Sequence, residues 1–276
     1  MRAHAGRSQL PTSRPGLPTM LQSPVASDRP LRHTAAIDTM KTLRLLPSLV
    51  VLQLLAASVF AAEPAALTEA ERAAGWKLLF DGRSLAGWRS FKKPDAPKAG
   101  WVVEDGMLKK QKGVRGGDII TTQTFGDFDL EWDWRIEAGG NNGLKYFITE
   151  ERSSAIGHEY QMIDDEGHPD GRMGAKRTTA SFYDVLPPSA TKPLKKPGEW
   201  NHSRVLVQGN QVEHWLNGAK VLTYELGSPA VLAAVQESKF KTVPGFGTKL
   251  RGHILLTDHQ DECWFRQLRI RELNGR

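Results

Sequence analysis

Short runs in which apolar and polar residues alternate recur along the chain from Gly75 to its C-terminal end. The clearest run is residues 128–136, where five apolar side chains alternate with four charged ones. A period of two places the apolar residues on one face of an extended strand and the charged residues on the other. We therefore predict a half-buried β-strand over 128–136. Its apolar face carries Phe128, Leu130, Trp132, Trp134 and Ile136.

Two turn signals mark β-hairpins in the second half of the chain. The first is Gly209-Asn210, and the second is Asn217-Gly218, which supplies the positive φ angles that a type I′ turn needs. The flanking segments 205–207, 212–216 and 221–224 are therefore predicted to form a three-stranded antiparallel meander.

Helical spacing is clear in only one segment, residues 229–240, among ten or more evenly spaced strand candidates. This balance predicts an all-β fold, in which two antiparallel sheets pack face to face as a β-sandwich or jelly roll. Residues 75–273 are expected to form this one domain.

The N-terminal part of the sequence has a different composition. Residues 40–62 begin with Lys41 and Arg44, continue with an apolar run and end in small residues, which is the layout of a secretory signal peptide. The alternative, a transmembrane anchor, is disfavoured because the apolar run is short and contains Pro47. Residues 1–39 are then a disordered extension or a mis-assigned start, and residues 63–74 are a short helix or a tether. We expect a periplasmic or secreted protein with no stable membrane insertion after cleavage.

The net charge must be recounted without that N-terminal part. The whole chain has 37 basic and 31 acidic residues, but residues 1–62 hold seven basic and two acidic ones. The remainder is nearly neutral, so the basic composition gives no reason to expect a nucleic-acid partner. A single cysteine, Cys263, excludes an internal disulfide, and its apolar neighbours indicate an inert buried thiol.

Residues 141–183 hold the densest set of chemically capable side chains. Glu159 and Gln161 lie two apart in a predicted strand, so both should project from one sheet face. Asp164 would join them only at a bulge or at the end of the strand. A Glu159–Asp164 pair could act as acid and base in glycosyl chemistry, although two solvated strand-end carboxylates would have the same spacing.

Two further clusters leave alternatives open. A divalent metal is possible at residues 158–170, where histidines and carboxylates are close in sequence, but their spacing fits neither a zinc signature nor an EF-hand. We therefore assign no cofactor and no metal ligands. His259 follows the apolar run that ends at Leu256. It is a candidate proton shuttle, because an unperturbed histidine titrates near neutral pH.

The tryptophans divide into two groups by their place in the pattern. Trp132, Trp134, Trp215 and Trp264 lie in predicted strands and are expected to pack in the core. Trp88, Trp101 and Trp200 lie near loops, where their faces could stack on sugar rings. Packing is the expected role for the majority of them.

Seven ordered segments resemble one known family. They include LLFDGRSLAGW, NNGLKYFITE, GHEYQMIDDEGHPDG, RTTASFYDVLPP and GHILLTDHQDECWFRQLRIREL. The chain from about 75 to 273 resembles the 3-keto-disaccharide hydrolase domain family, whose fold is concanavalin A-like. The resemblance implies a carbohydrate-active enzyme that cleaves glycosides already oxidised at C3, by hydrolysis or by C2-proton abstraction and β-elimination.

The resemblance also implies a set of site residues. Asn142, Gln161 and Asp164 match substrate-binding positions. For catalysis we infer Glu159 or His259 as the base, Lys145 with Gln161 as donors toward the keto oxygen, and Tyr183 as the acid. The sequence departs from the family pattern at Thr257 and Gln267, which leaves specificity open.

A second function class remains: a non-catalytic, lectin-like carbohydrate-binding module on the same kind of sheet. It would need stacked aromatics and amides, whereas elimination needs titratable groups that converge on one point. The expected partner in both cases is a small carbohydrate, and the sequence leaves the oligomeric state open.

Overall fold

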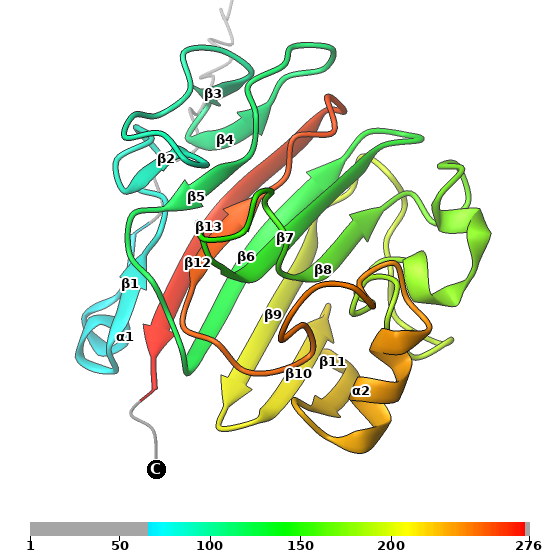
Figure 1. Ribbon diagram of the computed structural model, residues 1–276. Helices are drawn as coiled ribbons and strands as arrows, with labels where there is room; N and C mark the ends of the chain where they lie inside the picture. The colour runs from blue at the N-terminus through cyan, green and yellow to red at the C-terminus, as the bar shows by residue number, and fades with distance from the viewer. Residues whose placement is uncertain (1–65, 274–276) are drawn as a thin grey trace, which may run out of the picture. The chain divides into compact units, whose positions relative to one another are not determined.

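The computed structural model describes residues 66–273 (Figure 1). The predicted extension 1–39 and the predicted signal peptide 40–62 lie outside the described residues. In the described part, none of the helices is long and apolar enough to cross a bilayer.

The fold is a sandwich of two antiparallel sheets, as the sequence predicts. The large sheet has eight strands in the order β11-β10-β9-β6-β13-β4-β3, with β1 also paired to β13. Its strands are β1 (Trp76–Leu78), β3 (Trp101–Glu104), β4 (Met107–Lys110), β6 (Phe128–Ile136), β9 (Asn201–Gln208), β10 (Gln211–Leu216), β11 (Ala219–Glu225) and β13 (Cys263–Glu272).

The small sheet has five strands in the order β2-β5-β12-β7-β8 and lies across the large sheet (Figure 1). Its strands are β2 (Trp88–Ser90), β5 (Ile119–Thr121), β7 (Asn141–Ile148), β8 (His158–Ile163) and β12 (His253–Leu256). Strand β8 is at one edge, where the segment 180–186 borders it through an isolated bridge between Tyr160 and Phe182.

The core forms where the inner faces of the two sheets meet. Trp132 of β6 packs edge-on against Tyr160 of β8, with ring centroids 5.0 Å apart, and Phe128 packs against Tyr146 of β7 at 5.9 Å. The predicted strand 128–136 is β6 with the same bounds, and its five apolar side chains are buried. The predicted meander is confirmed as β9-β10-β11, and both Asn217 and Gly218 have positive φ.

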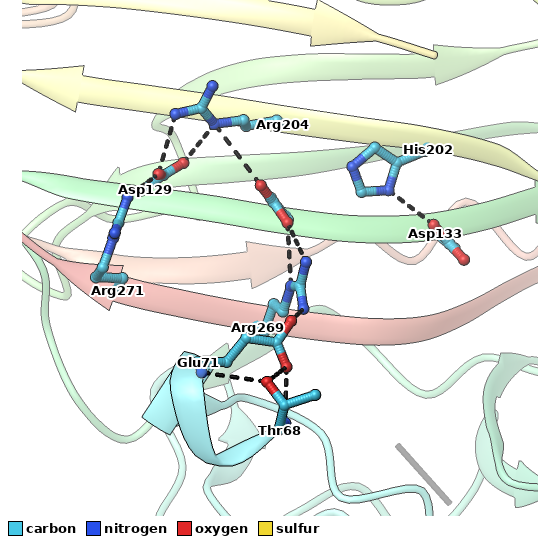
Figure 2. A network of polar contacts seen from close by, with 9 residues as sticks. Thr68, Glu71, Asp129, Asp133, His202, Arg204, Arg269 and Arg271 are labelled. Carbon is cyan, nitrogen blue, oxygen red and sulfur yellow. Dashed lines mark hydrogen bonds and ion pairs between the residues drawn. The ribbon is translucent and has the colours of Figure 1, made fainter. Parts of the chain in front are cut away.

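The outer face of the large sheet carries a network of ion pairs (Figure 2). Alternation along β6 turns Asp129, Glu131 and Asp133 outward. Asp129 accepts from Arg204 of β9 at 2.6 Å and from Arg271 of β13 at 2.8 Å, which explains how a carboxylate can be 1% exposed. Glu131 pairs with Arg269 at 2.7 Å, and Asp133 pairs with His202 at 2.8 Å.

The helices are short and differ in part from the sequence prediction. Helix α1 (Glu69–Ala73) lies in the predicted tether, where Thr68 and Glu71 form a capping box and Glu71 also pairs with Arg269 of β13. Helix α2 (Pro229–Gln236) begins at the Ser228 cap but ends four residues before the predicted end. The 3₁₀ turns η1 (Gly171–Met173) and η2 (Ala175–Arg177) had no sequence signal.

The tryptophans near loops pack against the protein itself. Trp88 and Trp101 are each 3% exposed, and their indole N–H groups donate to the carbonyls of Leu79 and Gly117. Trp200 lies on the outer face of the large sheet, with the Arg266 guanidinium 4.1 Å from its ring centroid. Their faces are therefore used for packing. Trp215 and Trp264, which were expected in the core, are instead half-buried under the guanidinium groups of Arg204 and Arg135.

Candidate active site

The register of β7 and β8 places the central side chains of the site. Lys145 pairs with Glu159, and Gly143 pairs with Gln161. Leu144, Tyr146, Tyr160 and Met162 belong to the main core. Because neighbours along a strand alternate between faces, Lys145, Glu159 and Gln161 lie on the face of the small sheet that points away from that core. The prediction that Glu159 and Gln161 share a face is confirmed.

Glu159 and Lys145 form a loose ion pair. The distance from Lys145 Nζ to Glu159 Oε2 is 3.8 Å, and the Lys145 ammonium also donates to the Ala155 carbonyl at 3.4 Å. The Glu159 side chain is only 6% exposed. At this distance the Lys145 ammonium can still donate a shorter hydrogen bond to a ligand, and the Glu159 carboxylate can still accept one.

Gly143 makes room for the Glu159 carboxylate. A Cβ atom at position 143 would lie 1.9 Å from Glu159 Oε1 and 2.8 Å from its Cδ. The carboxylate therefore lies directly over the bare main chain of β7, in a position that any larger residue would occupy. Gly143 is thus part of the site although it carries no side chain.

A cavity of about 340 Å³ opens beside this pair. Lys145 and Glu159 supply two of its charged groups, and Lys239 supplies the third. The rest of the lining is small or apolar and comes from the segment before β8 and the segment after α2: Ala155, Ile156, Gly157, Phe240, Thr242 and Val243.

Tyr183 is held next to Glu159, but its hydroxyl is already engaged. Its main-chain N–H donates to the Glu159 carbonyl at 3.0 Å, and its hydroxyl donates to Asp170 Oδ2 at 2.7 Å. Arg177 bridges Asp170 and Asp184. Burial, and then the hydrogen bond to the Asp170 carboxylate, raise the pKa of the Tyr183 hydroxyl well above its usual range. This geometry disfavours the prediction that Tyr183 is the acid, because its hydroxyl hydrogen is donated to Asp170.

Lys239 is the charged group that sequence reasoning missed. Its main-chain N–H donates to Asp184 Oδ2 at 2.7 Å, and its ammonium lies 4.1 Å from the centroid of the Tyr183 ring. The residue stays open to solvent at the mouth of the cavity. Desolvation around the ammonium lowers its pKa, and the charge of Lys145 adds to this while Glu159 opposes it.

Gln161 is enclosed and incompletely bonded. It is 1% exposed, and its Oε1 atom has no hydrogen-bond partner among residues 66–273. A buried amide oxygen without a donor is costly unless a ligand or water supplies one. This acceptor lies two residues from Glu159 on the same face, which fits the predicted substrate-binding role.

Asn142 and Asp164, the other two predicted substrate-binding residues, do not line the Glu159 cavity. The Asn142 side chain lies on the core side of β7, the same side as Leu144. It is fully buried, and its amide donates to the Thr257 carbonyl at 3.0 Å. Asp164 follows the end of β8, where its carboxylate accepts from the N–H groups of Gly139 and Gly167. Both side chains serve the chain's own turns and strand ends.

His259 takes no part in the contacts that join Glu159, Lys145 and Tyr183. It is exposed in the loop between β12 and β13 and is not among the residues that line the cavity. Its neighbour Asp258 fixes that loop by pairing with the fully buried Lys110 at 2.9 Å and accepting from Gly116 and Gly117. The structure therefore brings together Glu159, Lys145, Gln161 and Tyr183, but not His259.

The candidate metal ligands at 158–170 are dispersed. His158 is buried in the core, where burial lowers its pKa to about 3 and its Nε2 accepts from Gly247. Asp165 pairs with Lys192, and Asp170 pairs with Arg177. Within residues 66–273, no three histidine, cysteine or carboxylate side chains are grouped as a cation site.

A second cavity of about 340 Å³ lies at the opposite end of β8. It is bordered by Ile163, Trp134, Lys192 and Asn201. Lys192 is paired with Asp165 at 2.7 Å, and the side-chain Oδ1 of Asn201 accepts from the Lys195 main-chain N–H and from the Asn217 side-chain amide. Because Lys192 and Asn201 each have close partners of their own, whereas the Lys145–Glu159 pair is loose and Gln161 Oε1 is unbonded in the described residues, we place the active site at the Glu159 cavity.

Comparison with known proteins agrees with this geometry. A family model described as a 3-keto-α-glucoside-1,2-lyase-like domain matches residues 75–271, which include every residue of the Glu159 cavity. The chain belongs to this family. The 3-keto-α-glucoside-1,2-lyase-like domain includes both sheets of the sandwich, so the sequence resemblance is confirmed.

Relatives extend the comparison. A 3-keto-disaccharide hydrolase of Bacteroides thetaiotaomicron is 33% identical over 250 residues, 79% of this chain and 85% of that protein. Two crystal structures from Parabacteroides distasonis, both described as candidate glycosyl hydrolases, align with TM-scores of 0.69 and 0.57. They are 34% and 26% identical, and cover 76% and 72% of this chain and 99% of each of those chains. The lyase-like domain and these relatives support a carbohydrate-active function.

Proposed function

We propose that this protein cleaves 3-keto-glycosides at the Glu159 cavity. The observation that carries the proposal is the convergence of a carboxylate and two ammonium groups on one cavity, next to a buried acceptor without a partner. The names of the family and of the Bacteroides relative supply the substrate class. A binding module has no need for such a cluster of titratable groups.

The ketone at C3 defines what the site has to do. It acidifies the hydrogen on C2, so a base can remove that proton while electron density moves onto the C3 oxygen. The electron pair then re-forms the carbonyl and expels the C1 oxygen substituent, which leaves a C1–C2 double bond conjugated with the ketone. Water adds at C1 and a proton returns to C2, so the net reaction is hydrolysis; release before that addition makes the reaction a lyase.

Glu159 is the base in this proposal. Its carboxylate is enclosed, is fixed over Gly143 and is only loosely paired, so it can approach a C2 hydrogen. Lys145 is the donor to the C3 oxygen, because its ammonium lies next to Glu159 and carries the charge that a developing enolate needs. Gln161 accepts a hydroxyl hydrogen of the sugar.

A direct assay tests the function. The purified protein is incubated with 3-keto-trehalose and with 3-keto-cellobiose, with and without a chelator, and products are followed by mass spectrometry. We expect release of free sugar together with 3-keto-glucose or its enone, and no release from the unoxidised disaccharides. Binding without cleavage of any 3-keto-glycoside would favour the lectin-like alternative.

We also propose that the protein is exported, on the strength of the signal-peptide pattern in residues 40–62. N-terminal sequencing of protein from the cell envelope should give a start close to Ala62. A start at residue 1 or Met40 would contradict export by cleavage.

A further inference from the structure

The elimination step needs a proton for the departing oxygen, and the structure limits which group can give it. Tyr183 is next to the cavity, but its hydroxyl hydrogen is directed to Asp170 Oδ2 at 2.7 Å. Giving that proton away would leave a phenolate beside the Asp170 carboxylate, which is unfavourable because like charges repel. Lys145 donates toward Ala155 and pairs with Glu159 on the strand side of the cavity.

Lys239 is placed on a separate, well-fixed element of the same cavity. The helix α2 stops at Gln236, and the Ser238 hydroxyl then donates to the Val235 carbonyl and accepts from the Phe240 N–H. This turn and the bond from the Lys239 N–H to Asp184 fix the main chain at the cavity mouth. The position of Lys239 is thus fixed by three hydrogen bonds rather than lying in an unconstrained loop.

The surroundings of the Lys239 ammonium suit a group that carries a proton and can release it. The face of the Tyr183 ring, 4.1 Å away, favours the charged form. Glu159 and Asp184 do the same, whereas Lys145 and Arg177 favour its loss. Desolvation is the largest influence and lowers the pKa of Lys239. Since the residue remains open to solvent, water can return the proton after each turnover.

From this geometry we propose that Lys239 is the general acid that protonates the departing glycosidic oxygen. The Tyr183 ring packs against the Lys239 ammonium and holds it in place. The inference rests on the proposed 3-keto-glycoside cleavage. Glu159 takes the C2 proton, the C1–O bond breaks with its electron pair on oxygen, and Lys239 gives that oxygen one proton. After release Glu159 loses its proton and the Lys239 amine regains one, so the enzyme returns to its starting state.

Leaving-group dependence tests this role directly. A sugar alcohol is a poor leaving group and needs the proton, whereas 4-nitrophenolate leaves without one. We compare kcat/KM for 3-keto-cellobiose and for 4-nitrophenyl 3-keto-β-glucoside in wild type and in Lys239→Met. We expect a loss of about 10²–10³-fold on the disaccharide and of less than about fivefold on the nitrophenyl glycoside, because general-acid catalysis contributes only to the first.

Three further variants separate proton transfer from charge and from structure. Lys239→Arg keeps the positive charge but holds its proton too tightly to give it, so it should match Lys239→Met on the disaccharide. Lys241→Met, on an exposed neighbour in the same segment, should behave as wild type. Tyr183→Phe keeps the ring and should affect both substrates by the same factor.

The outcomes distinguish this inference from the function on which it rests. Equal losses on both substrates in Lys239→Met, or selective loss on the disaccharide in Tyr183→Phe, would overturn the role of Lys239 and leave the cleavage activity standing. If wild type cleaves neither substrate, the proposed function itself fails. The activity of Lys239→Met on the nitrophenyl glycoside also shows that the variant is folded.

Discussion

The ion pairs on the outer face of the large sheet and those in the Glu159 cavity differ in how completely they are bonded. On the large sheet, Asp129 is held by Arg204 at 2.6 and 3.0 Å and by Arg271 at 2.8 Å (Figure 2). In the cavity, Lys145 and Glu159 are 3.8 Å apart, and Gln161 Oε1 has no partner in the described chain. Both regions carry charged side chains on neighbouring strands, so composition alone does not distinguish them.

The difference shows where the protein uses polar groups for stability and where it keeps them for a ligand. Carboxylates that accept several short hydrogen bonds have little capacity left for a new partner. Loosely paired groups in an enclosed cavity have a cost in stability and gain from a ligand that bonds to them. Changes on the large sheet should therefore affect folding, and changes in the cavity should affect catalysis.

The largest effect is expected for Glu159→Gln. The amide keeps the shape but cannot remove the C2 proton, so kcat/KM on a 3-keto-disaccharide should fall by about 10³-fold. The melting temperature should change little, because the pair with Lys145 is loose. Glu131→Gln on the large sheet is the matched control and should keep full activity per folded molecule. Equal activity of Glu159→Gln and wild type would remove Glu159 from the site.

The second prediction concerns Gly143, the glycine that makes room for the proposed base Glu159. In Gly143→Ala the new methyl group must displace the Glu159 carboxylate, and a displacement of that size can cost about 10²-fold in kcat/KM. Gly252→Ala is the contrasting change, because its Cβ would meet main-chain atoms of Phe147 and Ile148 at 2.6–2.7 Å. It should lower the free energy of unfolding by about 1–3 kcal/mol. Thermal melts and kinetics on both variants decide whether the two glycines have these separate roles.

Asp129→Asn tests the large-sheet network. It leaves Arg204 and Arg271 without their shared carboxylate, and we expect a loss of about 2 kcal/mol in the free energy of unfolding, less than for a fully buried pair because both arginines are partly exposed. Chemical denaturation measures the loss, and kcat/KM corrected for the folded fraction should stay the same. A catalytic defect without a change in stability would contradict the division between the regions.

The smallest expected effect is the pH dependence of the stability contributed by the ion pair between Arg89 of β2 and Glu150. The hydrogen bond from Arg89 is the main cause that lowers the pKa of Glu150 to about 2. A carboxylate with a lowered folded-state pKa adds stability above its unfolded pKa, and this contribution is lost as pH falls through the folded value. The difference in free energy of unfolding between wild type and Glu150→Gln should be below about 1 kcal/mol near neutrality and vanish as pH falls below about 2. A difference that grows on acidification would contradict this assignment.

Local patterns were sufficient to predict the architecture. Alternation gave β6 its bounds, and Asn217-Gly218 located a hairpin, because both signals depend on residues close in sequence. Helix α2 was predicted too long, since its end depends on side-chain bonds of Ser238 that apolar spacing does not show. The 3₁₀ turns at 171–177 depend on loop contacts and had no periodic signal.

For the site, strand periodicity could predict only the side chains that lie within regular strands. It placed Glu159 and Gln161 on one face, and the same parity separates Asn142 from Lys145, three residues along β7. Lys239 enters the cavity from a segment 80 residues after Glu159 that has no strand pattern. The loop that carries His259 is fixed by the pair between Asp258 and Lys110 of the large sheet, a long-range contact that spacing does not reveal.

The most direct test of the central claim, that Glu159 removes the C2 proton, is cleavage in D₂O. Purified protein is given a 3-keto-disaccharide in D₂O, and the released 3-keto-glucose is examined by NMR, with substrate lacking enzyme as the control for spontaneous exchange. We expect product from the wild type to carry deuterium at C2, and Glu159→Gln to release no product above that control. Release of product by Glu159→Gln at the wild-type rate, with the original C2 hydrogen retained, would contradict the claim, because cleavage would then need neither Glu159 nor removal of that proton.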